Sequence, residues 1–263
     1  MLKLNNKEYK VCLLDTNIIR STLEMSQDIH LQTLLKLREN YVFAFSVLTL
    51  VEMSHRKELI EKFINFINSI PIIILQSSDQ VFRIEKHSHN RPVKIDELIL
   101  LISNPIIPKT KDEIVQFLRS SDFQNICKIV KDAQTGKYND LKKEIEKEIN
   151  YDLTPEEFTV KRLETQIGNN IAVRFQDSSY LSQKIINLLI YYTYFERKKK
   201  IPRSDPFDFL IACCVPYVDV FITEKNQTKS LNMINNNHDI INFVSILTMS
   251  DLREQKNMAP NSK

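Results

Sequence analysis

Glycine is almost missing from this sequence. Among 263 residues only Gly136 and Gly168 occur. Phosphate-binding loops and dinucleotide fingerprints need several glycines within a few positions, because the backbone must approach the phosphate closely. The sequence therefore excludes both kinds of nucleotide site.

Cysteine is also scarce, and none of the four thiols has the spacing of a zinc site. They are Cys12, Cys127, Cys213 and Cys214. The adjacent pair at 213–214 is a poor disulfide candidate, so we expect four reduced thiols in a cytoplasmic protein. His87 and His89 are close in sequence, but we expect them to be surface histidines.

Long apolar runs are absent as well. The longest stretch, 209–222, contains Pro216 and Asp219 and is too short to span a bilayer. The N-terminus lacks the apolar region of a signal peptide. We therefore expect no membrane partner.

The net charge of +3 is small, and the isoelectric point is near 8.5. A strongly basic surface is thus excluded, and any nucleic-acid site must be a local patch.

Strand and helix patterns alternate at the start of the chain and again near its end. The expected strands are 9–14, 41–45, 71–75, 218–223 and 240–246. The expected helices are 27–39, a helix from Ser46 past Glu52 towards Phe66, 206–215 and 226–234. Such alternation indicates an α/β fold, with a Rossmann-like parallel sheet flanked by helices.

Residues 79–200 have a different pattern. They are charged, lack a clear strand pattern and show helical periodicity at 111–119, 137–149, 155–167 and 180–198. We predict a discontinuous domain of residues 1–78 and 201–250, interrupted by a helical insertion at 79–200. Residues 251–263 are predicted to form a disordered tail.

Asp15 and Glu52 are the first two candidate site residues. Asp15 ends the first strand, at the edge where parallel α/β sheets bind ligands; it could equally cap the next helix. Glu52 shares one helix face with Ser46, Thr49 and Arg56. Taken alone, Glu52 is better explained by a salt bridge to Arg56.

Asp208 and Glu224 are the other two. Pro206 suits the first position of a helix, which makes Asp205 the N-cap and leaves Asp208 free to project; Asp208 could instead serve only the helix dipole. Glu224 follows strand 218–223 at the same edge as Asp15. Asp219 precedes that strand, so we expect it to be structural.

Together these four acids would meet at one edge of one sheet. Converging carboxylates repel one another unless a cation lies between them. Oxygen ligands favour Mg²⁺ or Mn²⁺. Asp15, Glu52, Asp208 and Glu224 are therefore the candidate metal ligands and catalytic residues.

The same segments resemble, in order, the four motifs of PIN-domain nucleases. They are Leu-Asp-Thr-Asn-Ile-Ile at 14–19, Ser-Val-Leu-Thr-Leu-Val-Glu at 46–52, Asp-Phe-Leu-Ile-Ala at 208–212 and Phe-Ile-Thr-Glu-Lys-Asn at 221–226. The resemblance implies a Rossmann-like fold and metal-dependent hydrolysis of phosphodiesters, usually in RNA. In many members the fourth acid lies two residues after the threonine, where this chain has Lys225 and where Glu224 stands one residue early.

Several further residues are candidates for contact with a nucleic-acid substrate. They are Thr16, Asn17, Ser46, Lys199, Lys200, Arg203, Thr223 and Lys225. The basic run before Asp208 could bind phosphates, or it could be a helix C-terminus carrying cations that the dipole favours. The tyrosines at 191, 192 and 194 could stack on bases, but their helical spacing favours core packing.

The leading hypothesis is a metal-dependent endoribonuclease, acting as a toxin or defence effector with RNA as substrate and an inhibitory or complex-forming protein as partner. Two alternatives stay open: a non-catalytic PIN-like module that binds protein or nucleic acid, and a DNA-directed nuclease of the same fold. A homo-oligomer is also compatible with the sequence.

Overall fold

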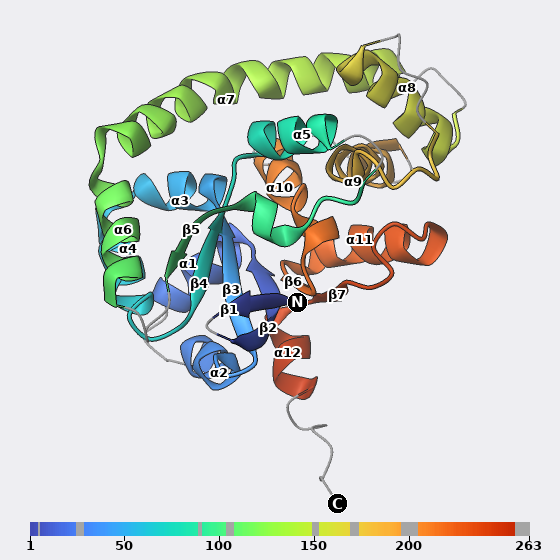
Figure 1. Ribbon diagram of the computed structural model, residues 1–263. Helices are drawn as coiled ribbons and strands as arrows, with labels where there is room; N and C mark the ends of the chain where they lie inside the picture. The colour runs from blue at the N-terminus through green and yellow to red at the C-terminus, as the bar shows by residue number, and fades with distance from the viewer. Residues whose placement is uncertain are drawn as a thin grey trace, which may run out of the picture.

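Seven strands form one mixed sheet, and β2 lies in its middle (Figure 1). The computed structural model describes residues 1–4, 6–24, 29–88, 91–103, 108–148, 153–168, 174–195 and 205–255. The strands are β1 (Leu2–Leu4), β2 (Lys7–Leu14), β3 (Tyr41–Ser46), β4 (Ile72–Leu75), β5 (Ile99–Ser103), β6 (Val220–Ile222) and β7 (Ser245–Leu247).

The strand order is β5-β4-β3-β2-β6-β7, with β1 paired to the start of β2. Five strands, β2, β3, β4, β6 and β7, are mutually parallel; β5 and β1 are antiparallel to their neighbours. The chain builds outward from β2 to β4 and then returns to the other side of β2. The carboxyl ends of β2 and β6 therefore lie at the point where the winding direction reverses, which is where open α/β sheets bind ligands.

Helices pack on both faces of this sheet. The α-helices are α1 (Thr16–Glu24), α2 (Ile29–Leu37), α3 (Val47–Ser54), α4 (Lys57–Phe66), α5 (Ser78–His87), α6 (Pro108–Arg119), α7 (Ser121–Glu148), α8 (Pro155–Ile167), α9 (Leu181–Ile190), α10 (Asp205–Ala212), α11 (Lys225–Asn237) and α12 (Met249–Gln255). Short 3-10 turns lie at η1 (Ile95–Leu98) and η3 (Val215–Tyr217), and a π-helical turn lies at η2 (Tyr191–Phe195). The long helix α7 arches along one side of the molecule from α6 towards α8 (Figure 1).

Side chains of the central strands alternate between two cores. Val11 and Leu13 of β2 pack with α9, α10 and α11, whereas Cys12 and Leu14 pack with α1 to α4 and α12. Alternate residues of β3 and β4 divide in the same way. Both faces are covered, so these strands are continuous apolar runs rather than alternating ones. The prediction of an α/β fold with a mostly parallel sheet flanked by helices is confirmed.

The prediction that residues 79–200 contain no strand is wrong. Strand β5 lies in this segment and pairs antiparallel with β4. A strand of five residues is too short for its periodicity to distinguish it from part of a helix. Helix α9, from the end of the same segment, contributes residues to the core of the sheet. The division into a discontinuous domain and an insertion stays a prediction.

Three boundaries also differ from expectation. The helix after Ser46 is broken into α3 and α4 at Arg56, whose backbone is extended; both pieces face the same core, so the apolar pattern conceals the break. The last strand is only β7, because the buried side chains at 241 and 244 belong to turns. The predicted tail begins inside α12, where Leu252 packs into the core; residues 256–263 lie outside the described residues.

The sequence predicts that no apolar stretch is long enough to span a bilayer. In the described part of the chain, no helix combines the length and the apolar character needed to cross a bilayer.

Candidate acidic site at the carboxyl edge of the sheet

Asp15 lies at the junction of β2, β6 and α1. Its backbone N–H donates to the carbonyl of Ile222 at 3.1 Å, and its own carbonyl accepts the first hydrogen bonds of α1, from Ile18 and Ile19. The side chain is only 2% exposed. Its Oδ1 accepts from the backbone N–H of Thr16 at 2.8 Å, and its Oδ2 accepts from the hydroxyl of Thr223 at 3.2 Å. Asp15 thus begins α1 and also places a carboxylate at the sheet edge.

This carboxylate is in an unfavourable environment for its charge. The pKa of Asp15 is raised to about 7, chiefly by burial and to a smaller extent by the negative charges of Glu52 and Glu224. The hydrogen bonds from Thr16 and Thr223 act in the opposite direction. The structure therefore brings three of the four predicted acids within electrostatic reach of one another, although they lie far apart in the sequence.

Glu52 is held in place by α3 and by Thr16. Helix α3 begins after Ser46, whose side chain accepts the N–H of Leu48 at 3.2 Å as predicted for a cap. The hydroxyl of Thr16 donates to Glu52 Oε2 at 2.5 Å. Burial raises the pKa of Glu52, while that hydrogen bond and the nearby side chains of His55 and Arg20 lower it. Ser46 is 1% exposed and engaged in capping α3, and its contact with a substrate stays a prediction.

The alternative explanation of Glu52, a salt bridge to Arg56, is wrong. Arg56 pairs instead with Glu24 at the end of α1. The break between α3 and α4 removes Arg56 from the turn above Glu52.

Thr223 and Glu224 complete the edge from the side of β6. Thr223 is fully buried, and its hydroxyl bonds both Asp15 and Gln227. Glu224 is exposed and occupies the N-cap position of α11, where its side chain makes no capping bond. Lys225, also exposed, is the first residue of α11.

Asp208 lies in the first turn of α10 and is half-buried. Gln227 Nε2 donates to the backbone carbonyl of Asp208 at 3.1 Å, which links α10 to the edge formed by Thr223 and Asp15. Helix α10 begins at Asp205, one residue before the predicted start. The side chains of Asp205 and Pro206 lie outside what the structure describes.

Of the other residues predicted to contact a nucleic acid, only some lie in the part of the chain that the structure describes. Asn17 is half-buried on α1 beside the site. The basic residues Lys199, Lys200 and Arg203, together with His89, lie outside the described residues. Tyr192 and Tyr194 are buried in the core, as helical spacing indicated.

Sequence reasoning missed Gln227. The only signal was its spacing of four residues from Thr223, one helical turn, and a single polar residue at that spacing is common. The hydrogen bond from Gln227 to Asp208 joins α11 to α10, and the sequence alone does not show that these two helices meet.

The acids supply the oxygen ligands that Mg²⁺ and Mn²⁺ prefer. The carboxylate of Asp15 is buried near two other carboxylates, and a cation would neutralise the repulsion between their charges. In the described part of the chain, however, no three His, Cys, Asp or Glu side chains are arranged as a ready-made metal site. The donor chemistry fits a divalent cation, while the side-chain arrangement would have to tighten around one.

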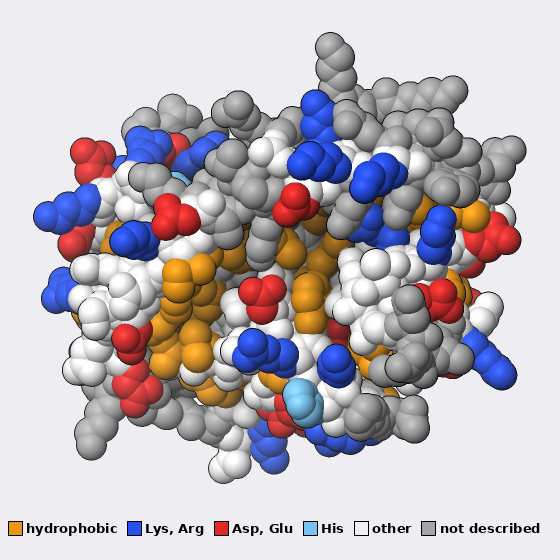
Figure 2. Space-filling model, turned by 90° about the horizontal axis from the view of Figure 1, so that it is seen from above, with side chains coloured by type: hydrophobic (Ala, Val, Ile, Leu, Met, Phe, Trp, Pro, Cys, Tyr) orange, Lys and Arg blue, Asp and Glu red, His pale blue; other side chains and the backbone are white. Residues whose placement is uncertain are grey.

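The surface around the upper face of the molecule has mixed charge. Lys and Arg side chains are scattered among acidic ones, and a hollow with hydrophobic walls has an acidic side chain near its centre (Figure 2). This distribution agrees with the small net charge of +3. On this face the described cations do not form one continuous basic block.

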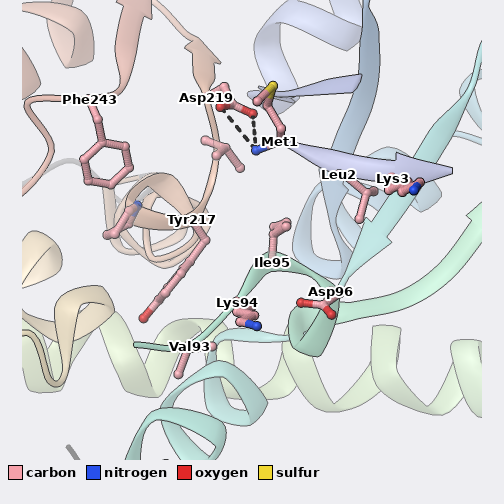
Figure 3. A pocket seen from close by; sticks show the side chains of 12 residues that line it. Met1, Leu2, Lys3, Val93, Lys94, Ile95, Asp96, Tyr217, Asp219 and Phe243 are labelled. Atoms are coloured by element: carbon pink, nitrogen blue, oxygen red, sulfur yellow. Dashed lines mark hydrogen bonds and ion pairs between the residues drawn. The ribbon is translucent and has the colours of Figure 1, made fainter. Parts of the chain in front are cut away.

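A separate pocket lies at the opposite end of β6. It has a volume of about 530 Å³ and is lined by residues including Ile95, Tyr217, Asp219 and Phe243 (Figure 3). Asp219 Oδ2 accepts the N–H of Val11 at 2.8 Å and pairs with the terminal amine of Met1 at 3.3 Å. The expectation that Asp219 is structural and remote from the acidic edge is confirmed.

Comparison with protein-family models, with curated proteins and with solved structures finds no match to this chain.

Proposed function

We propose that this protein is a Mg²⁺- or Mn²⁺-dependent endoribonuclease of the PIN type, with Asp15, Glu52, Asp208 and Glu224 as its acidic ligands. One observation carries the proposal: the carboxylate of Asp15, 2% exposed, lies under the electrostatic influence of Glu52 and Glu224 at the switch point of a parallel sheet. Many α/β proteins share such a sheet, so the proposal rests on the acids rather than on the fold.

A divalent cation bound here would lower the pKa of a water molecule and stabilise the charge that develops on the phosphate and on the leaving oxygen. The chain's own residues orient the ligands. Thr16 donates to Glu52 through its hydroxyl and to Asp15 through its backbone N–H. Thr223 donates to the other oxygen of Asp15. These donors hold repelling carboxylates in place before a cation arrives.

The substrate side of the proposal includes the exposed Lys225, the half-buried Asn17 and the basic residues before Asp208. The lysine and arginine side chains among them would contact phosphates of an RNA strand. The affinity for RNA would then fall as the salt concentration rises. A toxin or defence role with an inhibitory protein partner belongs to the same proposal.

Cleavage of a labelled RNA pool tests it. Wild type should cleave in Mn²⁺ or Mg²⁺ and not in EDTA, and Asp15→Asn or Asp208→Asn should abolish cleavage. Glu61→Gln, at an exposed acid on α4, is the matched control and should keep full activity. Undiminished cleavage by the Asp15 and Asp208 variants would overturn the assignment. Cleavage of single-stranded DNA but not RNA of the same sequence would identify a DNA-directed nuclease.

A non-catalytic binding module is the second candidate. It is favoured by Lys225 at the position where many PIN nucleases carry the fourth acid, and by the exposure of Glu224 at the start of α11. Thermal unfolding with increasing Mn²⁺ separates the two candidates. A nuclease should be stabilised by the cation, whereas the absence of any shift, together with RNA binding without cleavage, would favour the binding module.

A further inference from the structure

Gln227 connects two parts of the proposed site that are distant in sequence. Its Oε1 accepts a hydrogen bond from the hydroxyl of Thr223, and its Nε2 donates to the carbonyl of Asp208 at 3.1 Å. Only this orientation of the amide satisfies both contacts, because the carbonyl of Asp208 cannot donate. Gln227, on α11, therefore ties the end of β6 to the first turn of α10.

The same contact affects Asp15. The hydroxyl of Thr223 has one proton but faces two acceptors, Asp15 Oδ2 at 3.2 Å and Gln227 Oε1. A hydrogen bond to Gln227 is therefore made at the expense of the hydrogen bond to Asp15. Since Asp15 is nearly inaccessible to water, solvent does not replace the shared hydrogen bond at its Oδ2.

We infer that Gln227 is a positioning residue of the acidic site, one that fixes α10 and hence Asp208 relative to Asp15 and competes with Asp15 Oδ2 for the proton of Thr223. It would act through Thr223 and Asp208 and would not touch the substrate. This inference rests on the proposed function, because it assigns Gln227 to the same cation site.

Gln227→Met tests it, because methionine has similar length and keeps helix propensity but has neither the amide donor nor the acceptor. The first measurement is the Mn²⁺ concentration that gives half of the maximal thermal stabilisation. Loss of a residue that orients metal ligands typically costs 10- to 100-fold in metal affinity or activity. We expect that Mn²⁺ concentration to rise by about 10-fold or more. The kcat for RNA cleavage should fall by a similar factor, with a smaller change in KM.

Asn232→Met is the matched control, since Asn232 is exposed on the same helix and should leave both quantities unchanged. Gln227→Asn is a second variant that stays polar but is one methylene too short to span both partners. It should change both quantities in the same direction as Gln227→Met, and it keeps the test available if the methionine variant folds poorly.

The outcomes separate the two claims. If wild type cleaves RNA and responds to Mn²⁺, yet neither Gln227 variant changes the half-saturating Mn²⁺ concentration or kcat, the inference is wrong and the proposed function stands. If wild type neither cleaves RNA nor responds to Mn²⁺, the proposed function fails and takes this inference with it.

Discussion

Asp15 shows how a single buried residue can lower the stability of a fold. Its carboxylate is buried beside two other acids, and two hydrogen bonds only partly offset the resulting rise in its pKa. A residue selected only for stability would not carry a charge here. The conflict is what a cation site would require, because the same charge that opposes folding attracts the ion.

Replacing Asp15 with asparagine should therefore stabilise the metal-free protein. Asparagine can accept from the N–H of Thr16 with its oxygen and donate to the hydroxyl of Thr223, which can then donate to Gln227. The ordinary pKa of 3.8 rises to about 7 in the folded protein, a shift that corresponds to at most about 4 kcal/mol.

The pH dependence of this gain has a definite sign. Asp15 keeps its proton to a higher pH in the folded state than in the unfolded state. The contribution of Asp15 therefore lowers the free energy of unfolding of wild type as pH rises from about 4 to about 7, and no further above that. Urea unfolding in EDTA should show Asp15→Asn more stable than wild type by a margin that is larger at pH 8 than at pH 5. Equal margins at the two pH values would contradict this account, and Glu61→Gln serves as the control.

At the scale of single elements, two helix starts offer a direct comparison. Ser46 caps α3 through a hydrogen bond to Leu48, whereas Ser77 stands at the N-cap of α5 without any side-chain capping bond. Ser46→Ala should lower the free energy of unfolding by about 1 kcal/mol or more, because a buried cap is lost. Ser77→Ala should cost only a few tenths of a kcal/mol. Chemical denaturation of both variants measures the difference; equal costs would show that capping is not what stabilises α3.

The start of α10 gives a second prediction for an element. Asp205 begins the helix and Asp208 lies one turn further in. Asp205→Asn should leave cleavage intact and cost little stability, since asparagine is also accepted at helix starts. Asp208→Asn should abolish cleavage while the far-UV circular dichroism spectrum stays that of wild type. Equal loss of activity in two folded variants would refute the division of roles.

At the scale of the whole molecule, α9 joins the middle of the chain to the sheet. Leu188 of α9 is fully buried in the same core as residues of β2 and β6. A middle segment that unfolded separately would not share this core. The structure instead predicts one cooperative unit.

Leu188→Ala should accordingly shift a single unfolding transition rather than create a second one. The expected cost is about 2–5 kcal/mol for a leucine removed from a packed core. Calorimetry, with hydrogen exchange followed at β2, tests whether the sheet is destabilised with the helix. Ile129→Ala, at a side chain that is 66% exposed, is the control and should change stability by less than about 0.5 kcal/mol. Two separate transitions in Leu188→Ala would show that the middle segment folds on its own.

The sequence alone determined those features that depend on neighbouring residues. The apolar runs located β2, β3, β4 and β6, and the serine before α3 was identifiable as a cap. The acids at the ends of these strands could be placed at one edge, because parallel strands share the direction of their carboxyl ends. These are local properties, set by backbone preference and by periodicity.

Only the tertiary structure decided the features that depend on distant partners. It pairs β6 with β2, and it shows the hydrogen bond from Thr16 to Glu52 and the ion pair between Arg56 and Glu24. It also shows Gln227 bonded to both Thr223 and the backbone of α10. It also added β5 to the sheet. The physical reason is that each of these contacts joins elements far apart in the sequence. The local pattern of apolar and polar residues is compatible with many ways of packing these elements, so it does not determine which of them meet.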